Sequence, residues 1–141
     1  ENGIEYVGNW VNDDQPYPMK VKKGTMHAMP YSSEINDIPA MLGHHKSGEE
    51  FAQMIRDQFD VLYEEGAESG RVMAICLHPY ITGQPFRIGY FEKLYDMMRK
   101  KKGVLFWTGG GARSESIAVL GSTVRICALA TGALRGMLSA T

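Results

Sequence analysis

A single histidine, His78, stands where an apolar segment ends. Residues 72–77 read VMAICL, and Pro79 follows the histidine directly. Both alternating faces of this segment are apolar, which is typical of a strand buried in a parallel sheet, and Pro79 removes the next ladder donor. A histidine side chain can hold and release a proton near neutral pH. The residues alone therefore leave two interpretations open: a catalytic acid or base at the rim of a sheet, or a hydrogen-bonded histidine beside a loop.

The first element that must position this histidine is a helix. Ser47 and Glu50 have the spacing of a capping box and predict where the helix begins, and Gly66 can close it. An apolar stripe at i, i+3, i+4 spacing supports the same helix and comprises Phe51, Met54, Ile55, Phe59, Leu62 and Tyr63.

A second helix and a second apolar segment follow His78. The stripe of Phe91, Leu94, Tyr95 and Met98 predicts an amphipathic helix, and GVLFWTG at 103–109 predicts another buried strand. Alternation of helix and buried strand is typical of an α/β protein with a parallel sheet. In such proteins the carboxyl ends of the strands form the rim at which sites are built. His78 lies at that rim in the predicted arrangement.

The first 40 residues predict little regular structure. GIEYVGNW at 3–10 resembles a strand, and VNDDQPYPMKV at 11–21 has the Asn, Asp and Pro content of a loop. TMHAMPYSSEINDIP at 25–39 predicts a short strand and then a loop, because Pro30 and Pro39 disfavour a helix across it.

The composition limits the class of protein. A chain of 141 residues has room for one domain of ordinary size, and 44% hydrophobic with 22% charged residues indicates a globular one. The net charge of −1 gives no electrostatic reason to expect nucleic acid or a membrane as a partner, and no apolar stretch reaches the roughly 20 residues of a membrane span. The first residues lack the features of a signal peptide, and two distant cysteines form no disulfide framework. We therefore expect a cytoplasmic location.

Residues 110–141 differ in composition from the rest. From Gly110 onward the sequence contains no Pro, Asp, Lys, Asn, Gln, His, Phe, Tyr or Trp. A shift this sharp marks a boundary. We predict a domain over 1–109 and, over 110–141, a tail that is non-homologous to it and either poorly ordered or read from a shifted frame.

Several motifs, in the same order, resemble those of one family. YVGNWVNDDQPYPM, MPYSSEIND, FDVLYEEG and MAICLHPYITGQPFR, followed by FEKLYDMM and GVLFWTGG, are similar to the C-terminal half of polysaccharide deacetylase (NodB-homology) proteins. The subgroup resembled contains allantoinase-like enzymes and cytoplasmic peptidoglycan-deacetylase-like proteins. The resemblance covers residues 3–109. It implies the C-terminal part of a distorted (β/α) barrel that hydrolyses a non-peptide carbon–nitrogen bond in an amide, N-acetyl or ureide substrate.

The resemblance also implies that part of the site lies elsewhere. The family's metal-binding half carries an aspartate pair and an H-x-x-x-H pair and would precede residue 1, so any divalent metal of the parent enzyme would be held there. We expect no cofactor in this chain. His27, His44 and His45 lack that spacing and are interpreted as loop histidines. The chain alone is expected to be inactive.

The matching motifs supply the expected site residues. His78 corresponds to the histidine of the family's Leu-His motif, which protonates the leaving nitrogen, and Leu77 would support one wall of the pocket. Trp10 occupies the second position of an Asp-Trp pair that, in many members of the resembled family, lines the pocket and orients this histidine. Asn9 stands where that aspartate would be, and an amide cannot supply its charge.

Two further expectations concern charged residues. Asp13 and Asp14 could take over the orienting role, because the subgroup's NDD-x-PY pattern favours them as pocket residues; an Asx-turn pair before Pro16 is the alternative. Arg87 could bind a substrate carboxylate or carbonyl through its planar fork, or it could hold the start of a helix. We expect the His78 side chain to point into the concave face beside Trp10 and the Asp13–Asp14 loop.

The predicted partner is a small-molecule amide or ureide. The loops at 11–24 and 29–48 are long enough to act as lids, although they could instead pack subunits, because the resembled subgroup tends to form homo-oligomers. The alternative function is a catalytically inactive fragment or interaction module that self-associates or binds a full-length homologue.

Overall fold

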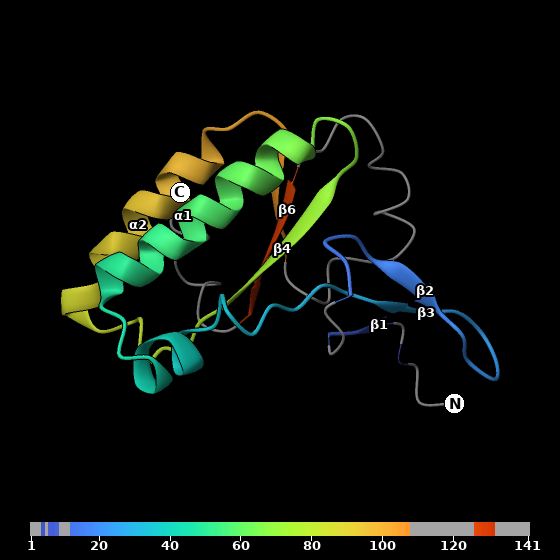
Figure 1. The fold of residues 1–141 in the computed structure, drawn as a ribbon, viewed down its shortest axis with the longest axis horizontal. Helices are drawn as coiled ribbons and strands as arrows, with labels where there is room; N and C mark the ends of the chain where they lie inside the picture. The colour runs from blue at the N-terminus through green and yellow to red at the C-terminus, as the bar shows by residue number, and fades with distance from the viewer. Residues whose placement is uncertain (1–3, 5, 9–11, 108–125, 132–141) are drawn as a thin grey trace.

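A computed structural model describes residues 4, 6–8, 12–107 and 126–131. Its larger sheet contains three parallel strands, β4 (Arg71–Cys76), β5 (Val104–Trp107) and β6 (Ile126–Thr131), in the order β4-β6-β5. Helices α1 (Gly48–Glu65) and α2 (Pro85–Arg99) lie side by side against this sheet (Figure 1). The α/β class predicted from the alternating pattern is confirmed.

The position of β6 was not expected from the sequence. This strand comes from the predicted tail, and it pairs in parallel with both β4 and β5, whose residues Arg71 and Val104 both stand opposite Ile126. Two strands that follow one another in the predicted order are therefore separated by a third. The other residues of the predicted tail lie outside the described ranges, so its origin stays a prediction.

The helix α1 begins and ends where the sequence rules place it. The Ser47 hydroxyl accepts a hydrogen bond from the Glu50 backbone at 3.1 Å, and the Glu50 carboxylate accepts one from the Ser47 backbone at 2.8 Å. This is the predicted capping box. Gly66 is the C-cap, and its backbone N–H donates to the carbonyl of Leu62 at 2.8 Å. Helix α2 begins with Pro85, a position where the missing N–H leaves no hydrogen bond unmade.

A smaller sheet is formed by β1 (Tyr6–Val7), β2 (Tyr17–Met19) and β3 (Met26–Ala28), in the order β1-β3-β2. Strand β1 is parallel to β3, and β2 is antiparallel to it. The expectation of a loop at 11–21 is thus wrong for β2. Its central residue, Pro18, is tolerated because β2 lies at an edge of the sheet.

One helix was missed by the sequence rules. A single π-helical turn, η1 (Ile38–Gly43), stands where a loop was predicted. Pro39 lies in its first turn, where a proline needs no intrahelical donor. The structure therefore overrides the interpretation of Pro39 as a helix breaker.

The hydrophobic core lies between the two helices and β4. The rings of Phe51 and Phe91 meet edge to face with their centroids 5.9 Å apart, and Met73 and Ile75 of β4 are fully buried beneath them. Burial of both faces of β4 confirms the prediction from its continuous apolar run. No helix in the described part of the chain has the length and hydrophobicity of a membrane span.

Candidate functional site

His78 lies two residues beyond the end of β4. The strand before it is buried, as is Leu77, so the backbone that carries the histidine is anchored in the core. The His78 side chain is itself 35% exposed. A rigid strand thus presents a partly exposed imidazole at the carboxyl end of the sheet.

The hydrogen bonds of His78 fix nearly all of its polar atoms. Its backbone N–H donates to Oδ2 of Asp37 at 2.7 Å, and its Nδ1 lies 2.6 Å from Oδ1 of the same carboxylate. Its carbonyl accepts from the backbone N–H groups of Ile81 at 2.9 Å and Thr82 at 3.0 Å, and from the Thr82 hydroxyl at 3.2 Å. Within the described part of the chain, Nε2 is the one polar atom of His78 without a partner.

Asp37 is the carboxylate that orients the histidine, and it is fully buried. A carboxylate oxygen accepts hydrogen bonds, so the proton of this pair lies on Nδ1 of His78. A buried charge is tolerated only when its oxygens are bonded, and both Asp37 oxygens are bonded to His78. The arrangement leaves Nε2 as the atom able to exchange a proton with a ligand.

The segment around Asp37 runs beside the end of β4. Asn36 forms a parallel bridge with Cys76, and the Cys76 N–H donates to the Ile35 carbonyl at 3.0 Å. The Asn36 side chain accepts from the backbone of Ile38 at 3.1 Å, which turns the chain into η1. These contacts bring Asp37 to a histidine that is 41 residues away in sequence.

Tyr31 lies close to the same strand end. A hydrogen bond with the Cys76 thiol, followed by burial, raises the pKa of Tyr31 to about 12, and the nearby Asp37 charge acts in the same direction. The phenol therefore keeps its proton at neutral pH.

Sequence reasoning missed Asp37. The segment MPYSSEIND that contains it is one of the matching motifs, but the residues considered for the orienting role are Asp13 and Asp14, with an Asx-turn pair as the alternative. The only local signal was an Asn-Asp pair ahead of Pro39, and the same composition is found in ordinary turns.

The structure does not bring Asp14 to His78. The carbonyl of Asp14 accepts a hydrogen bond from the Val72 N–H at 2.8 Å, which places it at the amino end of β4. His78 is six residues further along, and at about 3.3 Å per residue this is roughly 20 Å in an extended strand. Asp13, its neighbour, is exposed. The expectation that the Asp13–Asp14 loop lies beside His78 is wrong, because this loop packs against the opposite end of the strand.

The surroundings of Asp14 perturb its ionisation. Burial raises the pKa of Asp14, with smaller contributions in the same direction from Asp13 and Glu65, while the Arg71 guanidinium opposes the shift.

The remaining predicted site residues have contacts within the fold. Leu77 is buried in the hydrophobic core. The Arg87 guanidinium donates to the Ile81 carbonyl at 3.1 Å and lies 4.7 Å from the centre of the Phe86 ring, so it holds the turn between His78 and α2. Trp10 lies outside the described residues, as does Asn9.

The other histidines do not gather into a site. His27 is in β3, where its Nδ1 is buried and has no partner among the described residues. His44 and His45 are exposed directly after η1. In the described ranges no group of three or more His, Cys, Asp or Glu side chains is arranged to hold a metal ion.

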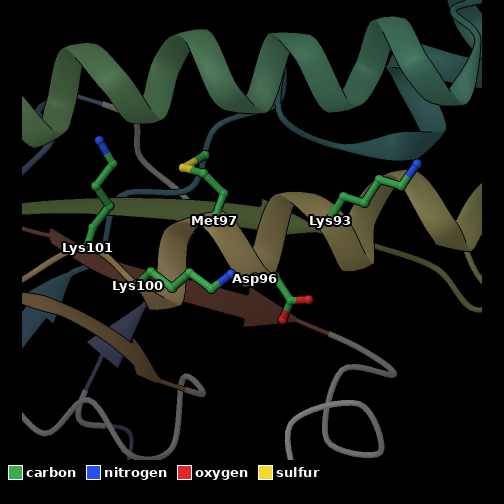
Figure 2. A pocket seen from close by; sticks show the side chains of 5 residues that line it. All are labelled: Lys93, Asp96, Met97, Lys100 and Lys101. Carbon is green, nitrogen blue, oxygen red and sulfur yellow. The ribbon is translucent and has the colours of Figure 1, made fainter.

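A surface pocket of about 620 Å³ lies on the second half of α2 and the turn after it, away from His78. Figure 2 shows its lining side chains, which are Lys93, Asp96, Met97, Lys100 and Lys101. None of the predicted site residues lines it. The turn at 79–84 joins His78 instead to the first turn of α2. Along the helix, Lys93 lies about 12 Å from Pro85, at 1.5 Å per residue.

A parallel sheet covered by helices, with a carboxylate–histidine pair just past the carboxyl end of a strand, defines an α/β protein of the kind that carries its site at the sheet's rim. No family model matches the sequence. A protein of Schizosaccharomyces pombe named "Putative polysaccharide deacetylase" is 38% identical over 104 residues, which cover 66% of this chain and 32% of that protein. The crystal structure of Puue allantoinase matches with a TM-score of 0.70 and 27% identity, over 84% of this chain and 39% of that one.

The two matches agree with each other and with the sequence motifs. The chain is similar to a deacetylase and to an allantoinase, and the resemblance seen in its sequence is confirmed. It spans only about a third of the length of the curated relative and 39% of the solved allantoinase chain.

Proposed function

We propose that this chain is the C-terminal part of a (β/α)-barrel hydrolase that cleaves a non-peptide carbon–nitrogen bond, with His78 as its general acid. One observation carries the assignment of the acid: among the described residues, every polar atom of His78 except Nε2 has a hydrogen-bonding neighbour. A side chain locked in this way presents its remaining nitrogen to a ligand without further loss of conformational freedom.

The proposed step is proton transfer to the leaving nitrogen. Water adds to the carbonyl carbon of the substrate and gives a tetrahedral intermediate. When the carbon–nitrogen bond breaks, its electron pair remains on nitrogen, which takes the proton from Nε2 of the imidazolium. Asp37 accepts the Nδ1–H bond throughout and stabilises the charged ring. General acid catalysis of this kind contributes typically 10²–10⁴-fold in rate.

The group that activates water belongs to the part of the hydrolase that would precede residue 1. The described residues offer no donor cluster that fits a metal ion, so no step here is assigned to one. Trp10 remains a proposed pocket residue of the complete enzyme, whereas Asp13 adjoins Asp14 at the amino end of β4. Asp14 and Leu77 are less suited to contact a substrate at His78, since one lies at the far end of β4 and the other is buried.

The names of the two relatives support a class of substrate. One is named a polysaccharide deacetylase and the other an allantoinase, and we propose for this chain an amide, N-acetyl or ureide compound. A small molecule is favoured over a polymer, because the segment at 29–48, which brings Asp37 to His78, is long enough to cover a pocket.

The test is His78→Ala in the complete hydrolase. We expect kcat to fall about 100-fold or more while substrate affinity changes little, because the lost group acts in the transition state. Ring opening of allantoin and acetate release from N-acetylglucosamine oligomers measure the two substrate classes. His44→Ala is the matched control, since the His44 side chain is exposed and takes no part in the hydrogen bonds that join Asp37 to His78, and it should retain full turnover. Unchanged turnover in the His78→Ala enzyme would refute the proposal.

A further inference from the structure

An exposed aromatic ring lies directly against the proposed acid. The ring centroid of Tyr80 is 5.6 Å from that of His78, in an edge-to-face arrangement with 60° between the planes. Tyr80 is nevertheless 62% exposed, so most of its ring faces away from the protein. The core does not use this side chain.

The backbone that carries Tyr80 is well fixed. Its carbonyl accepts a hydrogen bond from the Gln84 side chain at 3.2 Å, and Gln84 is also the N-cap of α2. The turn from Pro79 to Gly83 is so tight that a Cβ at Gly83 would clash with the Pro79 carbonyl oxygen. The exposed ring is therefore presented by a constrained turn and not by a long loop.

Other aromatic rings are exposed at the same end of the molecule. Phe86 and Tyr90 lie one turn apart at the start of α2 and are 70% and 40% exposed. Phe86 is stacked on the Arg87 guanidinium, and Tyr90 lies against Gly48 at the start of α1. Tyr80 differs from both because it contacts His78. Its hydroxyl has no partner in the described part of the chain.

We infer that Tyr80 is a specificity-determining residue that contacts the substrate beside the bond to be cleaved. This inference rests on the proposed function of His78. It adds that the substrate is an uncharged ring compound that carries an amide-type group. An aromatic ring next to the acid offers apolar surface to such a ring and a hydroxyl to a polar group at its edge. Because the turn that carries the ring is fixed before binding, little backbone freedom is lost when the substrate packs against the ring.

The test is a pair of substitutions in the complete hydrolase, assayed with allantoin and with N-acetylglucosamine oligomers. Tyr80→Ala should raise KM roughly tenfold or more for the preferred probe and leave kcat within about threefold, because the lost contact binds ground and transition states alike. Tyr80→Phe keeps the ring and should keep KM within about threefold. Phe86→Ala is the matched control, an exposed aromatic residue that does not contact His78, and it should leave KM unchanged.

Three results would overturn the inference. The first is that both KM and kcat stay unchanged in Tyr80→Ala. The second is that KM stays unchanged while kcat falls, which would show that Tyr80 only supports His78. The native mass measured by light scattering could drop with KM intact, which would assign the ring to a subunit contact.

Binding measurements separate this inference from the proposed function. Calorimetric titration of the same probes into His78→Ala and into His78→Ala/Tyr80→Ala compares affinities without turnover. A tenfold weaker affinity in the double variant supports the role of Tyr80 whatever the acid proves to be. An equal affinity in both removes the role of Tyr80 and leaves His78 to be judged by its own kcat.

Discussion

Asp37→Asn tests the carboxylate that orients His78 while keeping the shape of the side chain. In the native pair both oxygens accept, one from the backbone N–H of His78 at 2.7 Å and one at Nδ1 at 2.6 Å. The amide keeps one acceptor and replaces the other with an NH₂ donor. That donor would face Nδ1, so the ring proton would have to move to Nε2 and the doubly protonated acid would be disfavoured.

The size of the effect follows from the burial of Asp37, which is 0% exposed. Each hydrogen bond to a charged group is worth roughly 1.5–3 kcal/mol. Losing one of the two should lower the free energy of unfolding by about 2–3 kcal/mol. The catalytic effect should be larger than this structural one, about 100-fold or more in kcat, because the amide no longer supports the doubly protonated ring that donates from Nε2.

Two measurements on the complete hydrolase report these effects separately. Chemical denaturation gives the free energy of unfolding, and long-range ¹H–¹⁵N correlation spectra of labelled histidine show which ring nitrogen is protonated. We expect the His78 proton on Nδ1 in the native protein and on Nε2 in the neutral ring of the variant. Asp60→Asn is the control, since Asp60 is exposed on α1, and it should change stability by no more than about 0.5 kcal/mol.

A variant that keeps both its Nδ1 proton and its turnover would refute the reasoning. So would a loss of stability without any change in kcat, because Asp37 would then be a buried structural group that happens to touch His78. The combination of a displaced proton and a reduced kcat is the result that only an orienting role produces.

Two further predictions concern the ends of β4. Gly83→Ala should lower the free energy of unfolding of the complete protein by about 1–3 kcal/mol and also reduce kcat, because its Cβ would displace the Pro79 carbonyl that adjoins His78. The control Gly89→Ala, in open space within α2, should instead raise the free energy of unfolding by roughly 0.5–1 kcal/mol. Equal effects of the two substitutions would contradict the argument that the Pro79–Gly83 turn is tight. Asp14→Asn should raise the melting temperature at pH 7 but not at pH 3. The pKa of Asp14 is raised in the folded protein, so its contribution to stability is present below about pH 3.8 and is lost as the pH rises through the pKa of the folded state. A difference in melting temperature that does not depend on pH would contradict this prediction.

The parts of the fold that the sequence predicts are those set by local rules. The capping box at Ser47 and the stripe that begins at Phe51 depend on residues three or four positions apart, so α1 could be placed to within a residue. Strand β4 was equally accessible, because burial on both faces leaves a continuous apolar run. In each case the physical cause lies inside the segment itself.

The parts that were missed depend on pairing with distant segments. Strand β2 exists because Tyr17–Met19 pairs with β3, and its own composition is that of a turn. The same holds for β6, whose partners precede it by more than 20 residues. Neither strand has a periodic pattern strong enough to outweigh the loop or tail composition that surrounds it.

The candidate site shows the same division between local and distant causes. His78 was found because an apolar strand and a proline bracket it in the sequence, whereas the choice among carboxylates required knowing which loop returns to which end of β4. Asp14 is held at the amino end by Val72, and Asp37 is brought to the carboxyl end by the bridge between Asn36 and Cys76. A motif therefore identifies the histidine of such a candidate site, but the carboxylate that pairs with it is decided by which segment lies beside the last residues of the strand.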